Sequence, residues 1–136
     1  MMPAEQQQSE PIDAGQLRRP RNPRREDRPW GSYEVLTRGP GFQVKRLSIK
    51  PDSRLSYQWH RHRAETWTVA RGIAKVTING EDQMLGPSQS IHVPRTHKHR
   101  IANPSSIEPL EIIEVQTGDY LGEDDIVREE DDFGRA

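Results

Sequence analysis

Apolar and polar residues alternate along most of the chain beyond residue 28, in short runs separated by turn residues. An alternation with a period of two is typical of β-strands that bury one face. It predicts strands at residues 32–36, 42–49, 55–60, 66–70, 73–78, 83–85, 90–93, 99–102 and 110–116. Asn79-Gly80 is typical of a two-residue hairpin between two of these strands.

The two ends of the chain depart from this pattern. Residues 1–27 are rich in Gln, Pro and Arg and show no apolar period, so we expect a disordered or arm-like tail. One interpretation is that this basic tail binds an acidic partner. The alternative is a solvated tail, or an arm that lies on a neighbouring subunit. Residues 123–130 begin with acidic side chains, which predicts a short C-terminal helix. Residues 28–136 then form one all-β domain, an antiparallel sandwich or a small barrel.

The composition narrows the class of function. The net charge of −1 argues against a general nucleic-acid or membrane-surface binder. The chain has no cysteine, which excludes disulfides, thiolate metal sites and a catalytic cysteine. No apolar run has the length of a membrane span or the place of a signal-peptide core, so we expect a cytoplasmic protein. Exposed sheet edges predict a homodimer.

A short stretch of the chain gathers side chains that bind metals. Gln58, His60 and His62 fall on one face of an extended strand, and a turn after His62 would bring in Glu65. His99 is the expected distant ligand. Such nitrogen and oxygen ligands suit one divalent ion, which is zinc, manganese, iron, cobalt or nickel. The alternative is a set of surface histidines on a polar strand.

These residues resemble the first motif of the cupin family, in which two histidines are followed by a glutamate and a glycine. Counting back from Glu65 and Gly72, the histidine positions fall on Gln58 and His60. Glutamine therefore replaces the first histidine.

The second cupin motif matches Pro94, His99 and Asn103, with Thr96 in place of its glycine. The resemblance implies a cupin double-stranded β-helix, also called a jelly-roll barrel. It implies that the metal ligands are Gln58, His60, Glu65 and His99. By this resemblance His62 does not bind the metal directly. It contacts either one of the ligand residues or the substrate.

Longer stretches resemble type II mannose-6-phosphate isomerase. They are residues 28–33, 44–46, 58–67 and 112–126. In that family this cupin is usually the C-terminal domain of a fused mannose-1-phosphate guanylyltransferase. The resemblance implies a metal-dependent interconversion of mannose 6-phosphate and fructose 6-phosphate. Nucleotidyl transfer is not expected, because the tail holds no Gly-rich phosphate loop.

The implied reaction assigns expected roles to further residues. A base must reach a carbon-bound proton, and His62 and Glu114 are the candidates; a metal-assisted hydride shift stays open. Arg63 lies within the histidine motif and is the leading partner for the substrate phosphate. Other candidates for substrate binding are Lys45, Arg54, Arg100 and Tyr120.

Two other functions stay open. Thr66 stands where the isomerase family commonly has histidine, which motivates a non-catalytic cupin that binds a metal or a sugar. His60, His99 and Glu65 also form the set of two histidines and one carboxylate that cupin dioxygenases use for iron.

Overall fold

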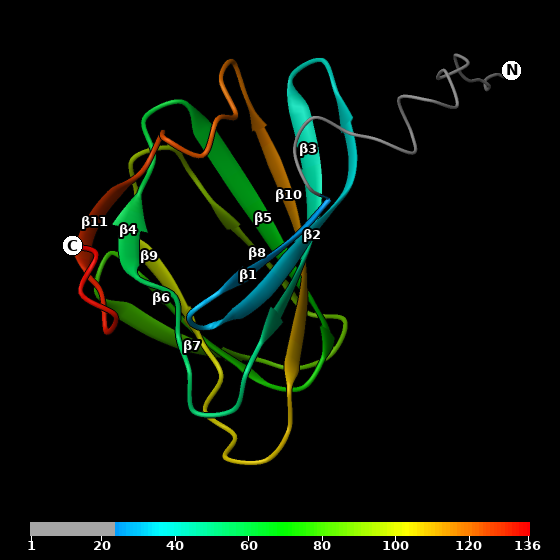
Figure 1. Ribbon diagram of the computed structural model, residues 1–136, viewed down its shortest axis with the longest axis vertical. Helices are drawn as coiled ribbons and strands as arrows, with labels where there is room; N and C mark the ends of the chain where they lie inside the picture. Colours follow the sequence, from blue (N-terminus) through cyan, green and yellow to red (C-terminus); the bar gives the residue numbers. More distant parts are fainter. Residues whose placement is uncertain (1–23) are drawn as a thin grey trace, which may run out of the picture.

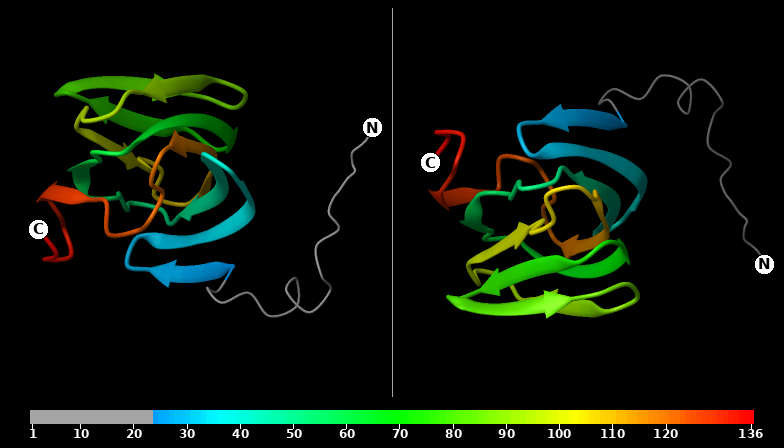
Figure 2. Two further views of the ribbon diagram at one scale, coloured as in Figure 1. Left: turned by 90° about the horizontal axis from the view of Figure 1, so that it is seen from above. Right: turned by 90° about the horizontal axis from the view of Figure 1, so that it is seen from below.

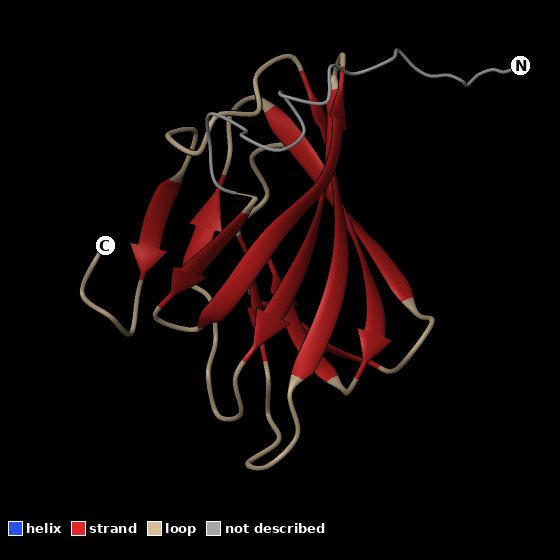
Figure 3. Cartoon of the chain, turned by 45° about the vertical axis from the view of Figure 1, so that its right-hand side comes forward, coloured by secondary structure: helices blue, strands red, loops and turns tan. Residues whose placement is uncertain are grey.

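The computed structural model describes residues 24–136, and these residues contain strands and loops (Figure 3). The strands are β1 (Arg25–Arg28), β2 (Gly31–Gly39), β3 (Phe42–Ile49), β4 (Tyr57–Trp59), β5 (Arg63–Arg71), β6 (Ala74–Ile78), β7 (Glu81–Leu85), β8 (Ser90–Val93), β9 (His99–Ala102), β10 (Leu110–Gly118) and β11 (Val127–Glu130). The predicted all-β class is confirmed. The bounds predicted for β3, β8 and β9 are those observed.

The strands form two antiparallel sheets that face each other (Figures 1 and 2). One sheet has the order β1-β2-β3-β10-β5-β8, and the other has the order β11-β4-β9-β6-β7. Strands far apart in the sequence are therefore neighbours, as β10 is of both β3 and β5. This crossed order is that of a jelly roll.

The inward face of the larger sheet changes from apolar to polar along its strands. On β10, Leu110 and Ile112 are buried at one end, and Glu114 and Gln116 are buried at the other. The neighbouring strands change at a similar level, with Ile49, Leu47, Lys45 and Gln43 on β3 and Val69, Trp67, Glu65 and Arg63 on β5. The apolar end packs the core, and the polar end needs internal partners because buried polar groups are costly alone.

Two predictions for the ends of the domain are wrong. Within the described residues there is no helix, and β11 with its preceding turn takes the place of the predicted helix at 123–130. Residues 25–27, predicted to belong to the tail, form β1 together with Arg28, and β1 pairs with β2. The rest of the predicted tail, residues 1–23, lies outside the described residues.

A search of the described part of the chain finds no helix that is long and apolar enough to cross a membrane. The predicted homodimer stays a prediction.

Candidate metal centre and adjoining cavity

Three buried side chains converge between the two sheets. His60 follows β4, Glu65 lies on β5 and His99 begins β9. One potential ligand atom from each lies within 4.8 Å of the other two. His60 Nε2 is 3.3 Å from Glu65 Oε2, and His99 Nε2 is 3.6 Å from Glu65 Oε1. The tertiary structure thus brings together three of the four predicted ligands at the spacing of a mononuclear metal site.

Backbone carbonyls fix the tautomer of both histidines. His60 Nδ1 donates to the carbonyl oxygen of Asp125, and His99 Nδ1 donates to that of His97 at 2.9 Å. A carbonyl oxygen only accepts, so the proton is on Nδ1 and each Nε2 presents a lone pair. His99 Nε2 is buried and has no hydrogen-bond partner among the described residues. Burial also lowers the pKa of His99, so a neutral ligand is favoured. A cation fits this unpaired nitrogen.

Glu65 is the anionic member of the group. Burial by itself raises the pKa of this carboxyl, but the positive charge of Arg63 outweighs burial and holds the pKa well below its usual range. Arg63 Nε donates to Glu65 Oε2 at 2.8 Å, and Trp67 Nε1 donates to Oε1 at 3.0 Å. Glu65 is therefore an ionised carboxylate, as a ligand for a divalent cation requires.

Glu114 is the second buried carboxyl, and its charge state differs. Trp67 Nε1 also donates to Glu114 Oε2 at 3.2 Å, so one indole bridges both carboxyl groups. Burial and the negative charge of Glu65 raise the pKa of Glu114 to about 8. Gln116 Nε2 donates to Glu114 Oε1 at 2.9 Å and fixes its orientation. Two neighbouring carboxyl groups with separated pKa values are typical of an acid–base site.

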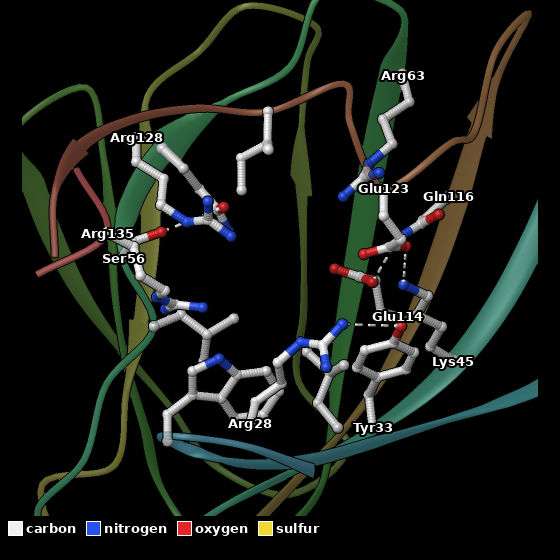
Figure 4. A pocket seen from close by; sticks show the side chains of 15 residues that line it. Arg28, Tyr33, Lys45, Ser56, Arg63, Glu114, Gln116, Glu123, Arg128 and Arg135 are labelled. Carbon is white, nitrogen blue, oxygen red and sulfur yellow. Dashed lines mark hydrogen bonds and ion pairs between the residues drawn. The ribbon is translucent and has the colours of Figure 1, made fainter. Parts of the chain in front are cut away.

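A cavity of about 250 Å³ adjoins the three residues and is lined mostly by polar and charged side chains (Figure 4). Gln58, Arg63 and Glu114 line this cavity. Gln58 lies two residues before His60, Arg63 donates to Glu65, and Glu114 shares the Trp67 indole with Glu65. Gln58 pairs with His99 across β4 and β9, and its Oε1 accepts from Ser56 at 3.3 Å. The fourth predicted ligand therefore lines the cavity and lies opposite His99 on the neighbouring strand.

The loop that carries His60 is held by Asp125, which the sequence analysis did not single out. The Asp125 carboxylate accepts from the backbone N–H groups of Arg61 and His62, both at 2.9 Å. Burial raises the pKa of this carboxyl, and the two N–H donors reverse the shift, so the pKa is lowered overall. Its carbonyl oxygen orients His60 at the same time. Asp125 therefore positions the metal centre through its main chain and its side chain.

The structure separates His62 and Tyr120 from the cavity. The chain bends after β4, so His62 does not continue the face of Gln58 and His60. The His62 side chain is 48% exposed, and its Nδ1 is 3.6 Å from Asp119 Oδ1. Tyr120 is also exposed and donates to Asp124. Neither residue lines the cavity.

Arg54 and Arg100 also have other partners. Arg54 forms a two-point ion pair with Asp132, at 2.7 and 2.9 Å. Arg100 Nε donates to the carbonyl oxygen of Leu55 at 2.9 Å. Neither lines the cavity, whereas Lys45 does, where it pairs with Glu123. We therefore give His62, Tyr120, Arg54 and Arg100 no role in the proposed reaction.

Several lining residues were missed in the sequence. Gln116 follows the alternation of β10, and its inward position was readable from that pattern. Arg28, Glu123, Arg128 and Arg135 lie in terminal segments whose pattern of apolar and polar residues does not show which side chains face a cavity.

Thr66 points away from the cavity. Glu65 and Trp67 on either side of it are buried, and strand geometry sends Thr66 to the opposite face. There its Oγ1 lies 3.1 Å from His92 Nδ1 on β8. The departure from the family pattern at this position therefore leaves the lining of the cavity unchanged.

Restoring histidine at this position is accordingly expected to have little effect. We expect Thr66→His to bind as much metal as the wild type and to turn over within about twofold of it, since the new imidazole lies on the outer face. Metal analysis and steady-state kinetics check this, with Thr66→Ala as the control for losing the contact with His92. A gain of tenfold or more in the histidine variant alone would contradict the assignment.

The turns of the two cupin motifs differ in backbone strain. Gly72 has φ of 91°, and a Cβ there would lie 2.8 Å from the carbonyl oxygen of Pro109, so glycine is required. Thr96 has φ of 67° although it is β-branched. Its N–H donates to the carbonyl oxygen of His60 at 2.9 Å, and this bond joins the two motif loops.

Relief of this strain is measurable. We expect Thr96→Gly to raise the free energy of unfolding by about 0.5–1 kcal/mol, because the relieved strain exceeds the entropic cost of glycine. Denaturant unfolding measures the difference. Arg95→Gly is the matched control, because Arg95 has no positive φ and the change there is expected to destabilise. An equal loss of stability in both variants would contradict the strain argument.

The sequence is similar to a known protein family and to individual bacterial proteins. The family described as mannose-6-phosphate isomerase C-terminal matches residues 18–131. Mannose-1-phosphate guanylyltransferase ManC of Salmonella typhimurium is 52% identical over 109 residues, and alginate biosynthesis protein AlgA of Pseudomonas aeruginosa is 54% identical over 109 residues. Each match covers 80% of this chain and 22% of the relative. The chain thus spans about a fifth of the length of these relatives.

Solved structures with a similar fold include a cupin domain. The Cnp3 cupin domain of Schizosaccharomyces pombe has a TM-score of 0.61 at 17% identity, covering 65% of this chain and 64% of that one. KdgF from Halomonas sp. has a TM-score of 0.62 at 15% identity, covering 68% and 84%. At these identities the likeness shows the fold alone, and the predicted cupin architecture is confirmed.

Proposed function

Because the chain belongs to the family described as mannose-6-phosphate isomerase C-terminal, we propose that it is a metal-dependent isomerase that interconverts mannose 6-phosphate and fructose 6-phosphate. The observation that carries the proposal is the meeting of two Nε2 lone pairs and one carboxylate beside a cavity that also holds Glu114. A sugar phosphate is an anion with many hydroxyl groups, and this polar, mainly cationic cavity suits it.

His60, Glu65 and His99 would hold the metal ion, with Gln58 as a fourth ligand. The ion would supply Lewis-acid chemistry, polarising the sugar carbonyl. The protein would contribute orientation, because Asp125 and the His97 carbonyl fix both imidazole rings before substrate arrives. Arg63, which donates to Glu65 and, from Nη2, to His60 Nε2 at 3.3 Å, would balance the charge of the carboxylate and give up its contact with Nε2 to the ion.

Glu114 would transfer the proton between the two carbons. As a carboxylate it takes the proton from C2 of mannose 6-phosphate, and as a carboxylic acid, whose proton exchanges with solvent, it protonates C1. The hydroxyl proton moves from O2 to O1, so atoms and charge balance without a further reagent. The hydrogen bonds from Trp67 and Gln116 hold Glu114 in one orientation for both steps.

A coupled assay on mannose 6-phosphate tests the proposed function. The protein is stripped of metal and then loaded with zinc, manganese, iron, cobalt or nickel in turn. Turnover that returns with at least one ion is the expected result. Bound metal without turnover on any hexose 6-phosphate would overturn the isomerase proposal and favour a cupin that only binds a metal or a sugar.

A further inference from the structure

The unpaired polar atoms of the interior gather at one place. Among the described residues, three buried side-chain nitrogens have no hydrogen-bond partner: Arg63 Nη1, His99 Nε2 and Arg128 Nε. Arg63 and Arg128 line the cavity, and His99 belongs to the metal centre beside it. Buried donors without partners are costly, so their clustering indicates a site that is completed by a ligand.

Two of the three nitrogens are donors on arginines. The metal centre accounts for His99 Nε2, which is an acceptor lone pair. The proton-bearing nitrogens of Arg63 and Arg128 call instead for an acceptor, and an anionic one for a charged guanidinium. Each of these arginines therefore suits an anion, and Figure 4 shows that they lie on opposite sides of the cavity.

Arg128 differs from the other cations of the cavity. Lys45 pairs with Glu123, Arg63 with Glu65, Arg28 with Glu26 and Arg135 with Asp131. Arg128 takes part in none of the ion pairs found in the part of the chain that the structure describes. Burial and the charge of Arg135 lower its pKa, which reflects a cation that faces another cation in a partly buried place.

Arg135 is held beside Arg128 by the C-terminal turn. Arg135 Nε and Nη2 donate to the two carboxylate oxygens of Asp131, at 2.8 and 3.0 Å, and its backbone N–H donates to the same group at 2.6 Å. Figure 4 shows Arg128 and Arg135 on one side of the cavity and Glu114 and Lys45 on the other, with Arg28 between them. Arg128, which has no ion pair among the described residues, thus lies across the cavity from Glu114, the proposed base.

We propose that Arg128, with Arg135 beside it, binds the phosphate group of the sugar phosphate. This inference rests on the proposed function for the identity of the sugar. A phosphate monoester carries about −1.5 to −2 charges at neutral pH and accepts paired hydrogen bonds from a guanidinium. It would neutralise Arg128, accept a further hydrogen bond from Arg135, and orient the sugar so that its C1 and C2 lie toward Glu114 and the metal centre.

Calorimetric titration of the metal-loaded full chain with inorganic phosphate tests the site without requiring turnover. We expect the wild type to bind phosphate and Arg128→Gln to bind it about 10- to 100-fold more weakly, because a charge-assisted hydrogen-bond pair is lost. Arg128→Lys keeps the charge but loses the paired donors of the planar guanidinium. Its affinity for phosphate is expected to lie between those of the wild type and Arg128→Gln. Arg46→Gln is the matched control, since Arg46 pairs with Glu34 at the surface and does not line the cavity.

Kinetics on mannose 6-phosphate give a second readout. Arg128→Gln is expected to raise KM about 10-fold or more and to keep its metal content, while Arg46→Gln matches the wild type. Unfolding curves check that each variant is folded, and Arg128→Lys serves if the glutamine variant is not. Equal phosphate affinity in wild type and both Arg128 variants, or no phosphate binding by the wild type, would overturn the site. Phosphate binding lost in Arg128→Gln but no turnover in any metal-loaded protein would keep the site and overturn the isomerase function.

Discussion

Replacing His99 with alanine is expected to remove tight binding of a divalent metal and to lower isomerase turnover by roughly 10³-fold or more. His99 supplies one of two imidazole ligands, and its Nε2 has no hydrogen-bond partner among the described residues that would compete for the lone pair. Without His99 the site keeps only one imidazole ligand, and the metal ion is bound much more weakly. Metal analysis after desalting and the coupled assay measure the two effects.

His62→Ala is the matched control for this variant. It removes a histidine from the same motif, but that histidine is half exposed and lies outside the cavity. We expect its metal content and turnover to stay near those of the wild type. If His62→Ala lost the metal while His99→Ala kept it, the assignment of ligands would be wrong.

Replacing Glu114 with glutamine is expected to lower kcat by about 10²- to 10⁴-fold while the metal stays bound. Glutamine keeps the size of the side chain but cannot take up a proton. Its amide also meets two donors, from Trp67 and Gln116, so we expect a modest loss of stability as well. Steady-state kinetics, metal analysis and thermal unfolding separate these effects.

Glu111→Gln is the control, because Glu111 lies on β10 outside the residues that line the cavity. Reaction in deuterated water distinguishes the two chemical routes. Proton transfer through Glu114 incorporates deuterium into the product carbon, whereas a hydride shift does not. A kcat near that of the wild type in Glu114→Gln, together with no incorporation, would replace the proposed base with the hydride route.

The sequence by itself determined the strands β2 to β10 and most residues of the candidate metal centre. Period-two alternation is a local property, because neighbouring side chains on a strand face opposite sides whatever the strand pairs with. Gln58 and His60 share a face for that reason, and Glu65 lies inward two positions before Trp67. His99 was the expected distant ligand, although nothing local links it to the first motif, and the cupin resemblance places it in a second motif.

Only the tertiary structure decided which of these residues face the cavity. His62 continues the alternation on paper, but the bend after β4, held by Asp125, turns it outward. The same acidic residues that predicted a helix at 123–130 have tertiary partners instead, with Glu123 on Lys45 and Asp125 on the His60 loop. A helix-start signal is weak, and such contacts outweigh it.

The cationic side of the cavity was hidden from the sequence for a related reason. Arg28 comes from β1 at one end of the domain, and Arg128 and Arg135 come from β11 and the turn after it at the other end. The pairing of β1 with β2 and of β11 with β4 brings these ends to one cavity. Alternation indicates which face of a strand is buried, but which distant strands meet depends on the packing of the whole jelly roll.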